Sequence, residues 1–203
     1  ILNGGLNGIF IVFDGKAILG TRARKIRSKS FAAFDSIGYP IAAFIDDNRI
    51  IKYLEAPVVQ GEVRFAPSIS DSVFLLKLIP GIRPEILAYL GQHYDIIVIE
   101  SYGVGGIPFY DKRNFMNELR TLTEKGKIIV IATQVMLEGS DAEKYEVGAL
   151  ALDRYNVLQS FDMTVESAVT KLMWLCAEHS DYEEIQDGFY TCINHDLLYE
   201  PKS

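Results

Sequence analysis

The sequence predicts an α/β fold in which helices flank a parallel sheet. Two aliphatic runs, 96–99 and 128–132, contain no polar residue, as is typical of strands that are covered on both faces. Apolar residues with helical spacing follow each run, so strands and helices alternate from residue 71 onward. This alternation predicts a parallel sheet with right-handed crossovers. We therefore assign residues 71–203 to a small carboxyl-terminal α/β domain.

The segment before this domain is too small to fold alone. Residues 8–13 and 16–19 predict two strands joined at Asp14-Gly15, which is a strong signal for a two-residue hairpin turn. One hairpin cannot bury enough surface to be stable by itself. We therefore assign residues 1–45 to the end of a larger amino-terminal α/β domain, whose other residues are expected to precede Ile1.

Two less regular segments follow the hairpin. Residues 30–34 have the spacing of a short helical turn, which Gly38 would end. Residues 46–70 contain turn residues and prolines, and we interpret them as a linker with a short strand at 50–54.

The carboxyl-terminal domain has a regular order of expected elements. Asp162 is expected to cap its last long helix, because an aspartate can accept hydrogen bonds from the free amides of the first turn. Gly126 is expected to end an earlier helix in a left-handed conformation. The expected order is strand 73–79, helix 85–90, strand 96–99, a helix from about 114 to Gly126, strand 128–132, helix 145–155, strand 157–158, the helix after Asp162 and a helix at 181–189.

Composition excludes several classes of partner. With 49% hydrophobic and 23% charged residues, a chain of 203 residues can bury a core. The net charge of -7 argues against nucleic acid or an anionic membrane as a partner, and no apolar run approaches the roughly 20 residues that span a bilayer. Cys176 and Cys192 lack the spacing of metal ligands, so we expect a reduced, cytoplasmic protein without a metal or cofactor.

The strand at 96–99 leads into a glycine-rich loop, which is the first candidate for a site. Tyr102 is followed by Gly103, Gly105 and Gly106, where backbone can approach another group because glycine has no Cβ. Ligands of open α/β sheets bind at this carboxyl edge. A dinucleotide fingerprint would need a glycine at Pro108. The simpler explanation is a tight turn between strand and helix.

Other polar residues are candidates with equally simple explanations. Lys25 lies in the basic run 20–30, where its ammonium could favour the deprotonated form of a nearby nucleophile. Basic runs are more often solvated edge strands. Thr133 and Gln134, at another strand end, could contact a polar ligand or satisfy the loop backbone.

Five segments together match one known family in that family's order. They are Gly8 to Lys25, Ile-Glu-Ser-Tyr-Gly-Val-Gly-Gly-Ile-Pro at 99–108, Ala-Thr-Gln at 132–134, Tyr-Glu-x-Gly at 145–148 and Asp162 to Leu172. As a set, these segments resemble the carboxyl-terminal half of bacterial L-asparaginases, most of all the cytosolic type I branch. The resemblance covers nearly the whole chain.

The resemblance implies an enzyme that hydrolyses the side-chain amide of L-asparagine to L-aspartate and ammonia through a threonine nucleophile, as a homodimer or homotetramer. The family's catalytic lysine falls on Lys25. Tyr102, Gly103 and Gly106 are implied to contact substrate, in the active site of a neighbouring subunit. Gly106 stands where relatives often have asparagine, which leaves the preference between L-asparagine and L-glutamine open.

The family's threonine motifs, Thr-Gly-Gly-Thr and Gly-Thr-Asp-Thr, do not occur in these 203 residues and are expected upstream of Ile1. The chain would then hold one catalytic residue of four and have no useful activity alone. Two alternatives stay open. One is the asparaginase-like subunit of archaeal tRNA-dependent amidotransferases, which the lack of a basic surface for tRNA disfavours. The other is a non-catalytic α/β ligand-binding or interaction module.

Overall fold

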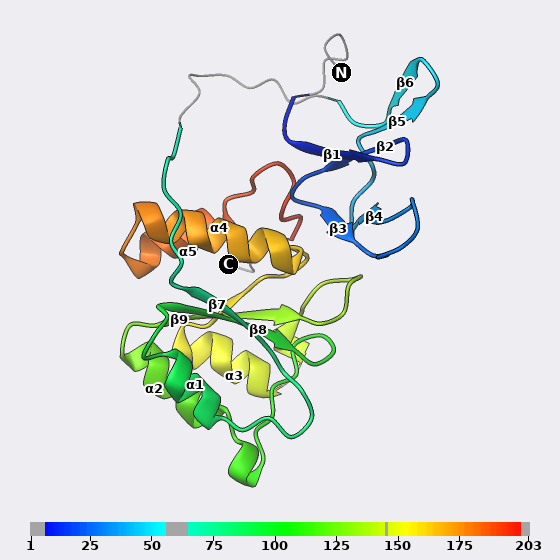
Figure 1. The fold of residues 1–203 in the computed structure, drawn as a ribbon. Coiled ribbons are helices and arrows are strands. Elements are labelled where there is room, and N and C mark those ends of the chain that lie inside the picture. The colour runs from blue at the N-terminus through cyan, green and yellow to red at the C-terminus, as the bar shows by residue number, and fades with distance from the viewer. Residues whose placement is uncertain (1–6, 56–64, 145, 200–203) are drawn as a thin grey trace.

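A parallel sheet of four strands forms the larger part of the fold. A computed structural model of the chain describes residues 7–55, 65–144 and 146–199 (Figure 1). Every pair in this sheet is parallel, and Val73, Ile96 and Ile128 are in register. The predicted α/β fold class is confirmed. In the sheet order β10-β9-β8-β7, the strands are β10 (Leu158–Gln159), β9 (Ile128–Thr133), β8 (Ile96–Ser101) and β7 (Val73–Lys77).

Helices cover both faces of this sheet. Alternate residues of β8 point to opposite faces: Ile97 packs in a core with α1, α2 and α3, and Ile96 packs in a core with α4 and α5. All residues of β8 and β9 are buried, which confirms that these apolar runs are covered on both sides. The helices are α1 (Glu85–Leu90), α2 (Met116–Glu124), α3 (Glu146–Tyr155), α4 (Val165–Glu178) and α5 (Tyr182–Tyr190), with 3-10 turns η1 (Asp111–Arg113) and η2 (Ala142–Lys144).

The ends of these helices confirm one prediction and correct another. Gly126, which follows α2, has φ +77°, as expected for a left-handed residue after a helix. The expectation that Asp162 caps α4 is wrong. Thr164 is the cap, because its side chain accepts a hydrogen bond from the Ser167 amide at 3.1 Å. The Asp162 carboxylate instead binds Arg22.

The first part of the chain forms an antiparallel sheet in the order β1-β2-β5-β6. The predicted hairpin is confirmed, with positive φ at Asp14 and Gly15 as the two-residue turn requires. The second hairpin of this sheet spans residues 43–52 and so crosses residue 45, where the sequence predicted that the first domain ends. The division of the chain into two domains and a linker stays a prediction. The strands are β1 (Phe10–Phe13), β2 (Lys16–Leu19), β5 (Ala43–Asp46) and β6 (Arg49–Lys52).

A short ladder replaces the helical turn expected at 30–34. β3 (Ala23–Lys25) pairs antiparallel with β4 (Phe34–Ser36), and Lys25 lies opposite Phe34. The expectation was wrong because pairing with β3 outweighs the weak local preference of five residues.

We name strands β1–β6 the first lobe, and the part of the chain from β7 to residue 199 the second lobe. Figure 1 shows the first lobe beside one end of α4. Within the described residues, no helix has the length and apolar character of a membrane span. Residues 56–64 of the predicted linker and residue 145, the expected start of a helix, lie outside the described residues.

Candidate active site

The glycine-rich loop after β8 folds back on itself. The Tyr102 amide donates to the Gly106 carbonyl at 3.0 Å, and the Gly106 amide donates to the Tyr102 carbonyl at 2.7 Å. Gly103, at the exposed tip, has φ +52°. The loop is therefore a closed turn, and the Gly106 amide already has a partner within it.

Packing against η2 explains another glycine of this loop. Gly105 is buried with φ +144°, and a Cβ on it would lie 2.7 Å from the Cα of Ala142. The Asp141 amide donates to the Val104 carbonyl at 2.6 Å beside this contact. The loop therefore keeps its shape through contacts within the second lobe, and Gly105 is needed for packing.

Thr133 and Gln134 satisfy the backbone at the carboxyl edge of the sheet. The Gln134 side chain donates to the Leu78 carbonyl at 2.6 Å and to the Glu100 carbonyl at 2.9 Å. The Thr133 hydroxyl donates to the Gly103 carbonyl. Both side chains therefore satisfy loop backbone, as one of the two explanations expected, and they join the glycine-rich loop to the ends of β7, β8 and β9.

Lys25 is exposed at the end of β3. Its Nζ lies 6.0 Å from the ring centroid of Phe34, and no carboxylate of the described residues forms an ion pair with it. Its neighbour Arg24 is bound to Glu166 of α4 at 3.2 Å. The Lys25 ammonium is thus free of a counter-charge within the described chain, on a strand that is tied to the second lobe.

A cleft of about 100 Å³ separates the β3–β4 ladder from the carboxyl edge of the parallel sheet. Arg24 and Gly38 line it from the first lobe, and Thr133, Thr164 and Tyr199 line it from the second. Neither Lys25 nor the glycine-rich loop is part of its lining. The contributions of Lys25, Tyr102, Gly103 and Gly106 to a common site therefore stay predictions.

Comparison with known families identifies the family to which this chain belongs. Residues 72–189, more than half of the chain, match the glutaminase/asparaginase carboxyl-terminal domain, and residues 3–58 match the asparaginase amino-terminal domain. The chain belongs to the asparaginase family. The resemblance seen in the sequence motifs is thereby confirmed.

Individual relatives show what share of an asparaginase's length the chain covers. The L-asparaginase of Thermococcus kodakarensis is 38% identical over 182 residues, which are 90% of this chain and 55% of that protein. The solved structure titled as the thermostable L-asparaginase from that organism superposes with a TM-score of 0.91 at 35% identity, covering 98% of this chain and 60% of that one. L-asparaginase I from Vibrio cholerae gives a TM-score of 0.80 at 25% identity, with 96% and 58% covered. The chain thus spans little more than half the length of these asparaginases.

A second kind of relative is more distant. One subunit of the glutamyl-tRNA(Gln) amidotransferase of Methanosphaera stadtmanae is 30% identical over 185 residues, which are 88% of this chain and 41% of that protein. The identity is lower than that of the Thermococcus L-asparaginase, and the match covers less of the relative.

Sequence reasoning missed the importance of Arg22, which helps to join the two lobes of the chain. Arg22 belongs to the basic run for which a solvated edge strand was the simpler explanation. Arg27 and Lys29 of this run are exposed, although they lie beyond the end of β3. Arg22 is instead fully buried and forms an ion pair with Asp162 at 2.7 Å. Its spacing gives no signal of burial, because its partner is 140 residues further along the chain.

Proposed function

We propose that this chain takes part in hydrolysing the side-chain amide of L-asparagine to L-aspartate and ammonia. The observation that carries the proposal is the match to an L-asparaginase over 90% of the chain in sequence and 98% in structure, across both lobes. In the proposed reaction a threonine hydroxyl attacks the amide carbon and ammonia leaves. Water then releases the acyl intermediate. The threonine would come from residues outside these 203.

Lys25 is the catalytic residue that we assign to this chain. Its ammonium has no carboxylate partner among the described residues, so its charge is available to another group. We propose that this charge stabilises the deprotonated form of the group that accepts the threonine proton. The neighbouring Arg24 pairs with Glu166 of α4 at 3.2 Å, which places β3 beside the second lobe.

The glycine-rich loop is proposed to contact substrate in a neighbouring subunit of a homodimer or homotetramer. The exposed tip at Gly103 and the half-buried Tyr102 are the parts of the loop that can reach another chain. The Gly106 amide donates to Tyr102, so a contact at this position would use van der Waals packing or the second lone pair of the Gly106 carbonyl. We infer a cytoplasmic protein, since both Cys176 and Cys192 are free thiols.

Ammonia release from L-asparagine by the full-length protein that contains this chain tests the function. Lys25→Ala is expected to lower kcat about a hundredfold or more, because aligned proton transfer contributes at least that factor. Lys29→Ala is the matched control: it removes an exposed lysine four residues away and should keep the parent rate. A Lys25→Ala rate equal to that of the parent would refute the role of Lys25.

Turnover of L-asparagine and of L-glutamine by the full-length protein distinguishes the remaining candidate functions. Hydrolysis of L-asparagine at a higher kcat/KM than L-glutamine supports the asparaginase. Glutamine hydrolysis that requires an added tRNA-bound partner subunit would favour the amidotransferase, which the 30% identity to an amidotransferase subunit supports. The absence of turnover with either amide in the full-length protein would favour a non-catalytic module.

A further inference from the structure

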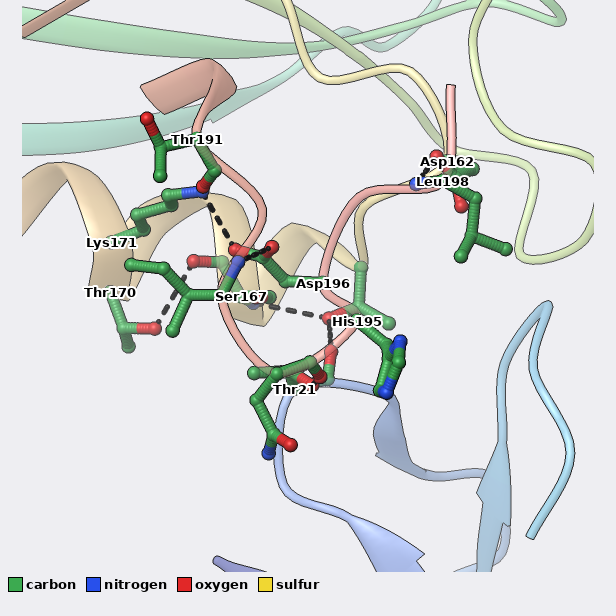
Figure 2. Close-up of polar contacts among 12 residues, drawn as sticks. Thr21, Asp162, Ser167, Thr170, Lys171, Thr191, His195, Asp196 and Leu198 are labelled. Carbon is green, nitrogen blue, oxygen red and sulfur yellow. Dashed lines mark hydrogen bonds and ion pairs between the residues drawn. The ribbon is translucent and has the colours of Figure 1, made fainter. Parts of the chain in front are cut away.

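A buried ion pair holds the carboxyl-terminal segment of the chain against α4. Lys171, in the middle of α4, lies 2.8 Å from Asp196, and their side chains are 4% and 2% exposed. Figure 2 shows the two side chains pointing at each other. Lys171 also donates to the Thr191 carbonyl at 2.6 Å. We name residues 191–199 the carboxyl-terminal strap, because it contains both hydrogen-bond acceptors of the Lys171 ammonium.

The ion pair stabilises an unusual backbone turn in the strap. Asn194 and His195 have φ values of +50° and +59°, a left-handed conformation that asparagine tolerates but that costs most other non-glycine residues free energy unless other contacts compensate. Asp196 supplies such a contact, since its second carboxylate oxygen accepts from the Ile193 amide at 2.7 Å. One buried carboxylate therefore closes the turn and anchors it to α4.

This turn presents two carbonyl groups to the first lobe. The Asn194 carbonyl accepts from the Thr21 hydroxyl at 2.7 Å, and the His195 carbonyl accepts from Nε of Arg22 at 2.6 Å. The His195 ring also stacks on Tyr39 at 4.9 Å between centroids. Through these contacts the strap fixes the corner between β2 and β3.

The same corner leads directly to Lys25. Arg22 precedes β3, its carbonyl accepts from the Ile37 amide at 2.9 Å, and its guanidinium is held on the other side by Asp162. Asp162 in turn accepts from the Leu198 amide at 3.0 Å, so the strap and the ion pair form one connected network. Movement of the strap would therefore move the start of β3.

We propose that Lys171 and Asp196 are positioning residues, which hold the strap so that β3 presents Lys25 at a fixed place beside the second lobe. The catalytic consequence rests on the proposed role of Lys25. The mechanical consequence, the anchoring of β3 by the strap, is independent of that role and can be measured without activity.

Amide hydrogen exchange on the full-length protein that contains this chain tests the anchoring. Lys171→Met/Asp196→Leu replaces the pair by apolar side chains, a change that often leaves global stability intact. The Arg22 and Ile37 amides are expected to exchange at least about tenfold faster, while the amides of β8 and β9 keep the parent rates. Arg120→Met/Glu124→Gln removes an exposed Arg–Glu pair on α2, outside the strap, and should leave both sets unchanged. The proposal would be overturned if the exchange rates of the Arg22 and Ile37 amides were unchanged, or if exchange in β8 and β9 accelerated equally.

Kinetics of the full-length protein test the catalytic consequence. The strap variant is expected to lower kcat at least about tenfold with less than a twofold change in KM. Combined with Lys25→Ala it should cause no further loss, because two changes that act through one group are not additive. Losses that multiply would overturn the positioning role. If Lys25→Ala alone kept full activity, the proposed role of Lys25 would fail while the exchange result stood.

Discussion

Arg22 and Asp162 are separated by 140 residues in the sequence, and their side chains meet at 2.7 Å in the interior. Arg22 has no exposed surface, and the Asp162 side chain is 8% exposed. The guanidinium also donates to the Asp162 carbonyl at 2.7 Å, so the arginine binds both the side chain and the backbone at this position. This pair fixes the first lobe of the chain to the segment just before α4.

Removal of the Asp162 carboxylate should be strongly destabilising. Asp162→Ala leaves the Arg22 charge buried without its partner, and we expect a loss of about 3–5 kcal/mol in the free energy of unfolding. Glu166→Ala is the control, because Glu166 pairs with Arg24 while 54% of its side chain is exposed. That change should cost less than about 1 kcal/mol. Urea unfolding of both variants measures the difference, and equal costs would contradict a special role for burial.

The glycine-rich loop offers a second test. Gly105→Ala combines an unfavourable positive φ with a Cβ 2.7 Å from the backbone of Ala142, so we expect a loss of about 2–4 kcal/mol. Gly81→Ala separates the two effects, since Gly81 has φ +88° and nothing within 4 Å of the added Cβ. It should lose only about 1–2 kcal/mol. Thermal midpoints of both variants measure the difference. Equal losses of stability would contradict the claim that packing against Ala142 requires a glycine at position 105.

Stability at acid pH should depend on Asp95. The Lys127 ammonium and the Ser72 hydroxyl donate to its carboxylate at 2.8 and 2.6 Å and hold the pKa of Asp95 below its ordinary value of 3.8. A carboxyl with a lowered pKa stabilises the fold fully above its unfolded pKa, and this contribution is lost as the pH falls through the folded pKa.

Lys127→Met is therefore expected to bring the pKa of Asp95 back toward 3.8, and to make the decline of stability between about pH 5 and pH 2 shallower. Urea midpoints over this range and the NMR titration of the Asp95 carboxyl measure both effects. Asp95→Asn, which cannot titrate, is the reference. A parent and a Lys127→Met variant with parallel pH profiles would disprove the assignment.

The two cysteines should differ in reactivity. Burial, together with the negative charge of Asp95, raises the pKa of the Cys176 thiol to about 11. At pH 8 only about one in a thousand of its thiols is then ionised, so alkylation by iodoacetamide should be slow and should rise about tenfold per pH unit. Cys192 is exposed and should react first.

Peptide mass spectrometry at timed intervals distinguishes the two sites. Cys192→Ser should leave only the slow reaction, and both cysteines should react at similar rates in urea, where burial is lost. Fast labelling of Cys176 in the folded chain at pH 8 would show that its thiol is more accessible than the structure indicates.

Local patterns in the sequence predicted most of the second lobe. In the second lobe, the aliphatic runs at 96–99 and 128–132 form buried strands as predicted. In the first lobe, Asp14-Gly15 forms the predicted hairpin turn. Both predictions succeed because side-chain period and turn conformation are properties of a few neighbouring residues. Family motifs spread over both lobes predicted membership of the asparaginase family, which the comparisons confirm.

Only the tertiary structure decided what the polar residues do. Arg22 looks like one more cation in an exposed run and proves to be fully buried; Asp162 looks like a helix cap and proves to be its partner. Gln134, which could have faced a ligand, binds two carbonyls of neighbouring strands. The physical reason is the same in each case. The cost of burying a charge or amide depends on which partners the fold brings within hydrogen-bonding distance, and those partners lie far away in the sequence.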